Sequence, residues 1–209
     1  ALIVVDAQGE NSIAVASGAN ANLSVSDIEN CQSDIVQSNI LLMQLEIPTD
    51  TVARAADIAW NAGVKVILNP APAAQLPDSL YPKLYMITPN RTETQLLTGI
   101  EVVDLESAKK AASALTQKGV EVVVITLGSQ GALILEHEKF VHVEAYRVKA
   151  VDTTAAGDVF NGAVCVALSE GKSVVEAVEF ASKAAAISVT RMGVQSSIPM
   201  REEVEKFSP

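Results

Sequence analysis

The sequence predicts an α/β fold in which a mostly parallel sheet is covered by helices. Strand-like apolar runs alternate with helix-like segments through short links, as in βαβ units. Hydrophobic residues make up 49% of the 209 residues and aromatic residues only 4%, so the core is built from Ala, Val, Ile and Leu. Polar side chains recur directly after the strand-like runs. We expect one domain over residues 1–209, long enough to bury a sizeable core.

The first 22 residues predict a β-hairpin and a short link. Strand-like residues 1–5 and 12–16 flank the turn-forming segment Gln8-Gly9-Glu10-Asn11. Residues 18–22 are small and polar, which predicts a connection. The chain opens on a strand-like run without Met or a leader pattern. We therefore expect it to begin inside a fold, as the C-terminal portion of a longer protein.

The remainder predicts buried strands and helices in alternation. Continuous apolar runs predict strands over residues 40–45, 64–68, 84–87 and 122–127. Ser24, followed three residues later by Asp27, is typical of a helix start. Start and stop signals predict further helices over residues 48–62, 91–98, 104–118, 159–164 and 174–189, with Gly63 and Gly119 as terminators.

Composition argues for a cytoplasmic enzyme and against several other classes. The net charge is −10 and no basic face is evident, which argues against a nucleic-acid partner. No apolar run is long enough to span a bilayer, which argues against a membrane partner. Cys31 and Cys165 lie far apart in sequence, and we expect reduced, buried thiols. His137 and His142 fall in an acidic, exposed-looking hairpin, where neither is expected to have a metal or catalytic role. Trp60, on a helix face near Ile58, is expected to serve packing.

The segment from Asp152 to Asp158, Asp-Thr-Thr-Ala-Ala-Gly-Asp, precedes an apolar helix and predicts an anion site. Small side chains leave the N–H groups of the first helical turn uncovered, and the helix dipole adds to their attraction for an anion. Asp158 is placed to accept a proton from an attacking hydroxyl. The residues alone favour the simpler alternative, an acid stabilised at an ordinary helix start.

The wider sequence resembles the ribokinase-like (PfkB) carbohydrate kinases and is most similar to the ribokinases among them. The segment 151–161 is similar to the family's D-T-x-x-A-G-D signature. The other similar segments occur in family order and are residues 43–46, 69–72, 88–93, 126–131 and 189–193. The resemblance covers essentially the whole chain. It implies a three-layer α/β/α Rossmann-like sandwich with part of a β lid, lacking the N-terminal portion that holds most sugar-binding residues.

The resemblance also implies roles for individual residues. Asp158 would be the general base and Ala155, Ala156 and Gly157 the anion hole, with Glu46 and Asp158 contacting the sugar. Glu93 would act on Mg²⁺ through water. Nucleotide-binding positions would be Asn90, Thr126, Gly128, Ser129, Gly131, Gly157 and Ser182. Oxygens around a monovalent cation, potassium, would come from Asp152, Thr154, Ser188, Arg191 (through its carbonyl), Gly193 and Ser197.

Simpler interpretations exist for three of these positions. Glu93 would also suit the first turn of a helix as a partner of the dipole. Glu46 would also suit a solvated loop before Pro48. The glycines from Gly128 to Gly131 would also suit an ordinary turn between strands.

The implied function is ATP-dependent phosphorylation of D-ribose at its 5-hydroxyl, which yields ribose 5-phosphate and ADP with Mg²⁺ and K⁺ as cofactors. One alternative is the same chemistry on another sugar or on a nucleoside. A second alternative is a truncated nucleotide-binding domain without turnover. The resemblance is compatible with a homodimer formed through the lid.

Overall fold

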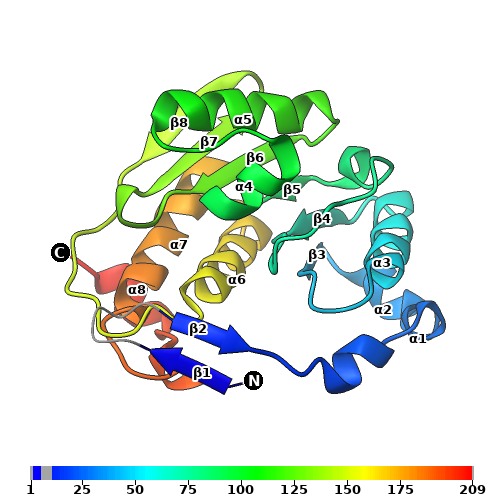
Figure 1. The fold of residues 1–209 in the computed structure, drawn as a ribbon, viewed down its shortest axis with the longest axis horizontal. Helices are drawn as coiled ribbons and strands as arrows, with labels where there is room; N and C mark the ends of the chain where they lie inside the picture. The colour runs from blue at the N-terminus through cyan, green and yellow to red at the C-terminus, as the bar shows by residue number, and fades with distance from the viewer. Residues whose placement is uncertain (1, 6–10, 209) are drawn as a thin grey trace. The chain divides into compact units, whose positions relative to one another are not determined.

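In the computed structural model, residues 2–5 and 11–208 are described, and they divide into two compact units. The larger unit comprises residues 17–128 and 132–142. The smaller unit comprises residues 1–16, 129–131 and 143–209. The ribbon is drawn in Figure 1. The single domain expected over residues 1–209 stays a prediction.

The larger unit is built on a sheet whose described strands follow the order β3-β4-β5-β6-β7-β8. Strands β3 to β6 are parallel and β7 is antiparallel to β6, in agreement with the predicted mostly parallel sheet. The strands are β3 (Ile40–Met43), β4 (Lys65–Leu68), β5 (Met86–Ile87), β6 (Val122–Thr126), β7 (Ala132–Glu136) and β8 (Lys139–Val143).

Burial follows position in the sheet. The central strand β6 is buried from Val122 to Ile125, which fits its run of β-branched residues. The prediction of a buried strand over residues 40–45 was wrong in its burial and length. Strand β3 ends at Met43, and Leu42 is 38% exposed because β3, the first strand of the described sheet, is covered less completely than the central strand β6. Strand β5 is likewise shorter than predicted.

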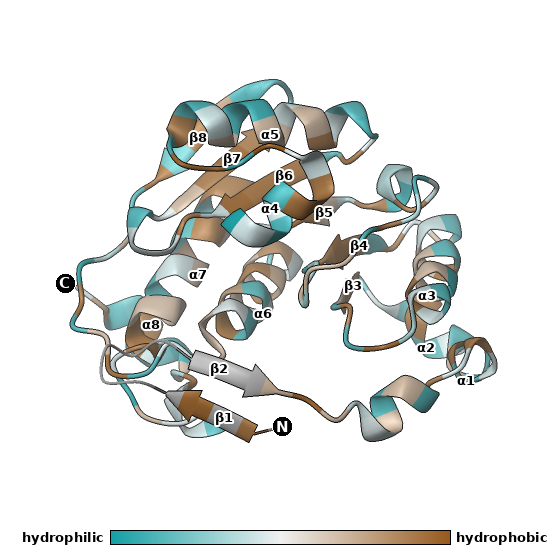
Figure 2. Cartoon of the chain, in the orientation of Figure 1, coloured by the Kyte–Doolittle hydropathy of each residue, from teal (hydrophilic) through white to brown (hydrophobic). Residues whose placement is uncertain are grey.

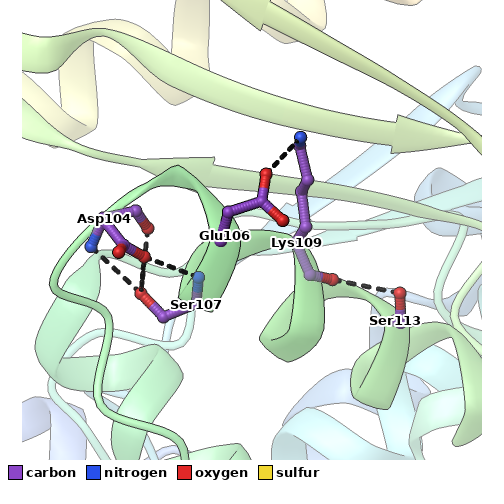
Figure 3. Close-up of polar contacts among 5 residues, drawn as sticks. All are labelled: Asp104, Glu106, Ser107, Lys109 and Ser113. Atoms are coloured by element: carbon purple, nitrogen blue, oxygen red, sulfur yellow. Dashed lines mark hydrogen bonds and ion pairs between the residues drawn. The ribbon is translucent and has the colours of Figure 1, made fainter.

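Helices cover this sheet. They are α1 (Val25–Asn30), α2 (Gln32–Gln37), α3 (Thr49–Asn61), α4 (Arg91–Thr98) and α5 (Leu105–Gln117). Helices α1, α4 and α5 begin at capping boxes, whereas α2, which was not predicted, and α3 have no side-chain cap. Ser24 and Asp27 form the capping box that their spacing predicts. Asp104 and Ser107 form another at the start of α5 (Figure 3). Gly63 and Gly119 follow α3 and α5 with positive φ, so each ends its helix as predicted.

The core of the larger unit lies between the sheet and helices α3 and α5. Val52, Leu68, Leu115 and Ile125 are fully buried in one cluster. Figure 2 shows the hydropathy pattern behind this core: β4 and β6 are hydrophobic, whereas α4 and α5 carry both hydrophobic and hydrophilic residues. Burial of this apolar surface is the main favourable contribution to folding.

Two expectations about packing were wrong. Trp60 is 53% exposed on α3, because it lies outside the buried face formed by residues such as Ala56 and Ala59. Cys31 is exposed at the junction of α1 and α2, whereas Cys165 is half-buried and its burial raises the pKa of its thiol to about 11. Both cysteines are free, as expected. Among the described residues, no helix combines the length and apolarity needed to cross a membrane.

The smaller unit contains a hairpin and a helical pair. Strands β1 (Leu2–Val5) and β2 (Asn11–Ala14) pair antiparallel, as predicted, although part of the predicted turn lies outside the described residues. Helices α6 (Ala156–Ser169) and α7 (Val174–Ser188) pack against each other, and α8 (Arg201–Lys206) packs on α7. Short 3₁₀ helices occur along the whole described chain and are not confined to the smaller unit. They span Gly18–Asn22, Tyr81–Lys83, Gly128–Gln130 and Gln195–Ser197.

Candidate active site

The carboxyl ends of four parallel strands meet at one edge of the larger unit. Asn69 follows β4 and is 8% exposed; its backbone N–H donates to the Met43 carbonyl (2.9 Å) and its side-chain amide donates to the Thr88 carbonyl (3.1 Å). Asn90 forms a parallel bridge with Thr126. The polar residues that follow β4, β5 and β6 are therefore held side by side, as the sequence predicts. Glu46 follows β3 and is exposed.

Asn90 and Glu93 bind each other at the start of α4. The Asn90 side-chain oxygen accepts the Glu93 N–H (2.9 Å). The Glu93 carboxylate accepts the Asn90 backbone N–H at Oε2 and the Asn90 side-chain amide at Oε1, both at 2.8 Å. Glu93 is 5% exposed, and burial raises its pKa above the ordinary value, partly opposed by the Asn90 N–H. The first-turn role left open for Glu93 is thus realised as a capping box.

The segment from Thr126 to Gly131 is the connection between β6 and β7. Thr126 pairs with Ala132 across the antiparallel strands, and Gly128 to Gln130 form one 3₁₀ turn. Gly131 has φ +89°, and a Cβ at this position would lie 1.9 Å from the Val143 carbonyl oxygen. Only glycine fits there without movement of the backbone. The turn interpretation is confirmed, while the proposed contact with a nucleotide stays a prediction.

Helix α6 begins without a side-chain cap in the described chain, unlike α4, α5 and α7. Its N-cap residue is Ala155, which adopts a left-handed conformation with φ +60°. The Ala156 N–H contacts the Thr153 carbonyl at 3.2 Å, and the Ala155 carbonyl accepts the Val159 N–H. Gly157 and Asp158 are exposed in the first turn. The geometry therefore presents backbone N–H groups, the positive end of a helix dipole and a carboxylate at one place.

Asp152 joins the segment before α6 to the segment after α7. Its Oδ1 accepts the Thr154 N–H (2.9 Å) and its Oδ2 accepts the Gly193 N–H (3.1 Å). The Val189 carbonyl accepts the N–H groups of Val151 (2.7 Å) and Asp152 (3.2 Å). The Thr154 side chain first, and then the backbone N–H groups of Thr154 and Gly193, lower the pKa of the Asp152 carboxyl.

Several of the residues predicted around a cation are buried in this region. Thr154, Ser188 and Ser197 are each less than 9% exposed. The Ser188 and Ser197 hydroxyls donate to nearby carbonyls, whereas the Thr154 hydroxyl is buried without a hydrogen-bond partner in the described chain. The Thr154 hydroxyl favours the ionised form of Asp152 electrostatically, but it makes no hydrogen bond to the described residues. An unpartnered buried oxygen suits a site for a weakly hydrated cation.

The remaining predicted residues are less closely tied to these groups. Ser182 is half-buried on α7. The Arg191 side chain forms an ion pair with Glu203. Because a guanidinium has no acceptor atom, Arg191 can offer a cation only its backbone oxygen. The Glu203 pairing was missed from sequence, because a contact across 12 residues carries no local signal. Asn161, whose side-chain amide donates to the Gly157 carbonyl (2.8 Å), was also missed as a support of the first turn of α6.

Comparison with known proteins decides the family. The model of the pfkB family carbohydrate kinases matches residues 1–201. The chain belongs to the pfkB carbohydrate kinase family. The expected resemblance is thereby confirmed, and with it the assignment to enzymes that transfer a phosphoryl group to a carbohydrate.

Individual relatives support the same family and fold. The chain is 51% identical over 207 residues to a ribokinase of Haemophilus influenzae, covering 99% of this chain and 68% of that protein. It is 38% identical over 206 residues to a deoxyribokinase of Salmonella typhi, covering 98% and 67%. The structure of Arabidopsis thaliana ribokinase complexed with ribose and ATP matches with a TM-score of 0.88 at 33% identity, covering 99% and 68%. The fold is ribokinase-like, as predicted.

Proposed function

We propose that the protein is an ATP-dependent ribokinase that converts D-ribose and ATP to D-ribose 5-phosphate and ADP. The observation that carries this proposal is the start of α6, where Asp158 lies beside helix N–H groups that no side chain of the described residues caps. This arrangement occurs within the family's D-T-x-x-A-G-D signature. The 51% identity to a ribokinase supports ribose as the sugar.

In the proposed mechanism, Asp158 accepts the proton of the ribose 5-hydroxyl as that oxygen attacks the γ-phosphorus. A bond forms between O5 and the γ-phosphorus, and the bond between the γ-phosphorus and the bridging β-oxygen breaks as ADP leaves. The N–H groups of Ala155, Ala156 and Gly157 stabilise the negative charge on the transferring group, and the Ala156 N–H is shared between that group and the Thr153 carbonyl (3.2 Å). The exposed position of Asp158 supports access to both substrates.

The nucleotide would be held at the loops after β5 and β6. Asn90 and Thr126 are bridged to each other, and their position after parallel strands is where ligands bind in open α/β sheets. Gly128 and Ser129 provide backbone that a nucleotide can approach closely, since a Cβ at Gly128 would meet no described atom within 4 Å. Gly131, which packs against the Val143 carbonyl, would hold this turn in place and contribute its own backbone groups. Gly157 and Ser182, in the smaller unit, are the further nucleotide contacts that the resemblance implies.

Two metal ions fit the residues present. Around potassium, the buried Thr154 hydroxyl and the neighbouring Asp152 suit an ion that takes oxygen ligands with little hydration. Carbonyl and hydroxyl oxygens of Ser188, Arg191, Gly193 and Ser197 would complete that site, where the ion would supply positive charge beside the start of α6. For Mg²⁺, the described residues contain no cluster of three or more His, Cys, Asp or Glu side chains suited to a metal. A single carboxylate, Glu93, acting through water, fits an ion that keeps most of its hydration.

The sugar would be contacted by Glu46 and Asp158. The exposed carboxylate of Glu46 can accept hydrogen bonds from two vicinal hydroxyls. The similarity to a deoxyribokinase supports a second candidate, the same reaction on 2-deoxyribose. Another sugar or a nucleoside remains an alternative substrate, and a nucleotide-binding protein without turnover remains an alternative class. The free cysteines support a cytoplasmic location.

The substrate is tested by measuring ADP release from the full-length protein with Mg²⁺, K⁺ and one of D-ribose, 2-deoxyribose, fructose or adenosine. We expect the highest kcat/KM for D-ribose, by about tenfold or more over 2-deoxyribose, as a lost hydrogen bond to a site built for a hydroxyl implies. A higher value for another acceptor would assign the protein to that substrate. ATP binding without transfer to any acceptor would favour the binding protein.

A further inference from the structure

Helix α8 is anchored firmly on the helical pair of the smaller unit. Val204 is 2% exposed and packs in one cluster with Val159 of α6 and Ile187 of α7. The Arg201 guanidinium binds both carboxylate oxygens of Glu170, which lies at the end of α6. A bidentate pair of this kind fixes orientation as well as distance. Helix α8 therefore has a defined position relative to α6 and α7.

Glu203 connects this anchored helix to the segment after α7. Its Oε2 accepts the Met200 N–H (2.7 Å), which caps α8. Its Oε1 accepts a hydrogen bond from the Arg191 guanidinium (2.5 Å), with a second, longer contact to Oε2 (3.4 Å). Both side chains are partly exposed, and exposed ion pairs contribute little to global stability. The consequence of this pair is therefore local, because it fixes where Arg191 lies.

Arg191 belongs to a short segment, residues 189–193, and the residues at both ends of this segment contact Asp152. The Val189 carbonyl accepts the Val151 and Asp152 N–H groups, and the Gly193 N–H donates to Asp152 Oδ2. The backbone between these two contacts includes the Arg191 carbonyl. Gly193 has φ +96°, a left-handed conformation that favours glycine, so the backbone turns sharply just after Arg191.

The end of α8 also contacts the chain that leads to Asp152. The rings of Phe207 and Tyr146 pack edge to face, with centroids 5.5 Å apart and planes at 81°. Residues 201–207 thus hold both segments that meet at Asp152, one through Glu203 and the other through Phe207. We call residues 201–207 the C-terminal clamp.

We propose that the C-terminal clamp positions the cation site and that Glu203 is its positioning residue. By holding the Arg191 side chain, Glu203 sets where the carbonyls of residues 191–193 lie relative to Asp152. Glu203 touches neither substrate nor ion in this proposal. The inference rests on the proposed potassium site of the kinase. It predicts that breaking the pair weakens potassium binding more than it weakens the fold.

The test uses Glu203→Gln in the full-length protein, because Gln keeps an oxygen for the Met200 N–H while it removes the charge that holds Arg191. The matched control is Glu205→Gln, which breaks another exposed ion pair of α8, that with Arg201, without a contact to the segment after α7. The first readout is the rise in melting temperature with KCl at constant ionic strength, which reports cation binding without turnover. The second is the potassium concentration that gives half-maximal kinase activity.

We expect Glu203→Gln to raise the potassium requirement about two- to fivefold in both readouts, the range that an exposed pair can supply. The kcat at saturating potassium and the KM for ribose should stay near the wild-type values, and Glu205→Gln should not shift the potassium requirement. Arg191→Met breaks the same pair from the other side and keeps the carbonyl. It should give the same shift, with no further shift in the double variant.

The outcomes separate the clamp from the function on which it rests. If the wild-type protein responds to potassium and both Glu203→Gln and Arg191→Met have the same potassium requirement as wild type, the clamp is overturned and the kinase proposal stays intact. A wild-type protein that phosphorylates ribose but shows no potassium response in either readout would overturn the cation site and the clamp together. If Glu203→Gln does not fold, Arg191→Met alone decides between the two results.

Discussion

Replacing Asn90 by Ala should destabilise the fold more than the loss of a helix cap explains. The substitution removes the side-chain oxygen that caps α4, which costs about 1 kcal/mol. It also removes the side-chain amide that donates to Glu93 Oε1. Glu93 is 5% exposed, so its carboxylate would lose a partner that water cannot readily replace, which costs a further ~1–3 kcal/mol. The expected loss in the free energy of unfolding is therefore about 2–4 kcal/mol.

Ser173→Ala is the matched control for this prediction. Ser173 caps α7 through a capping box with Glu176, but both residues are exposed, so only the cap of about 1 kcal/mol should be lost. Urea unfolding of the full-length protein without ligands, followed by circular dichroism at pH 7, measures both losses. The difference should shrink as the pH falls and Glu93 is protonated. Equal losses for the two variants at pH 7 would refute the argument that buried Glu93 depends on Asn90.

Further predictions concern the turn after β6, the titration of Glu93 and the cation. Gly131→Ala should destabilise by about 3 kcal/mol or more, because its Cβ would lie 1.9 Å from the Val143 carbonyl oxygen. At Gly128 an added Cβ would meet no described atom within 4 Å, so Gly128→Ala should lower the free energy of unfolding by only ~1–2 kcal/mol, through its positive φ. Equal urea midpoints for the Gly131→Ala and Gly128→Ala variants would contradict this difference. Because the folded state holds the Glu93 proton more tightly, stability should fall as pH rises from the ordinary pKa of Glu93 through its raised value. Glu93→Gln should remove that component from a pH series of urea midpoints. Replacing potassium by sodium should slow ribose phosphorylation, and identical rates would argue against the Asp152–Ser197 site.

The sequence predicts those parts of the fold that local chemistry determines. The box of Ser24 and Asp27 begins α1, and the β-branched run of β6 forms the buried centre of the sheet, because spacing and side-chain shape act locally. Asn90 and Glu93 have the same three-residue spacing, and their reciprocal hydrogen bonds form the capping box that this spacing favours. Spacing of this kind is therefore enough to predict the structural role of Glu93, whereas its role toward magnesium is implied only by the resemblance.

Features that depend on distant partners could not be predicted. The exposure of Leu42 and Trp60 depends on which elements cover β3 and α3, and an apolar residue does not specify its neighbours. The Arg191–Glu203 pair joins residues from two different segments. The unpartnered hydroxyl of Thr154 becomes visible only once the backbone around Asp152 is known. The resemblance to a family supplied the cation residues, which no periodicity or spacing indicates.

In the proposed mechanism, Asp158 removes the proton of the ribose hydroxyl during phosphoryl transfer. The most direct measurement compares wild type and Asp158→Asn in the full-length protein, with ribose-dependent ADP release and ATP affinity measured side by side. Asp158 is exposed, so the variant should fold and bind ATP nearly as wild type does. We expect kcat to fall by roughly 10²-fold or more while the affinity for ATP is retained. Turnover of Asp158→Asn at a rate close to wild type would contradict the account.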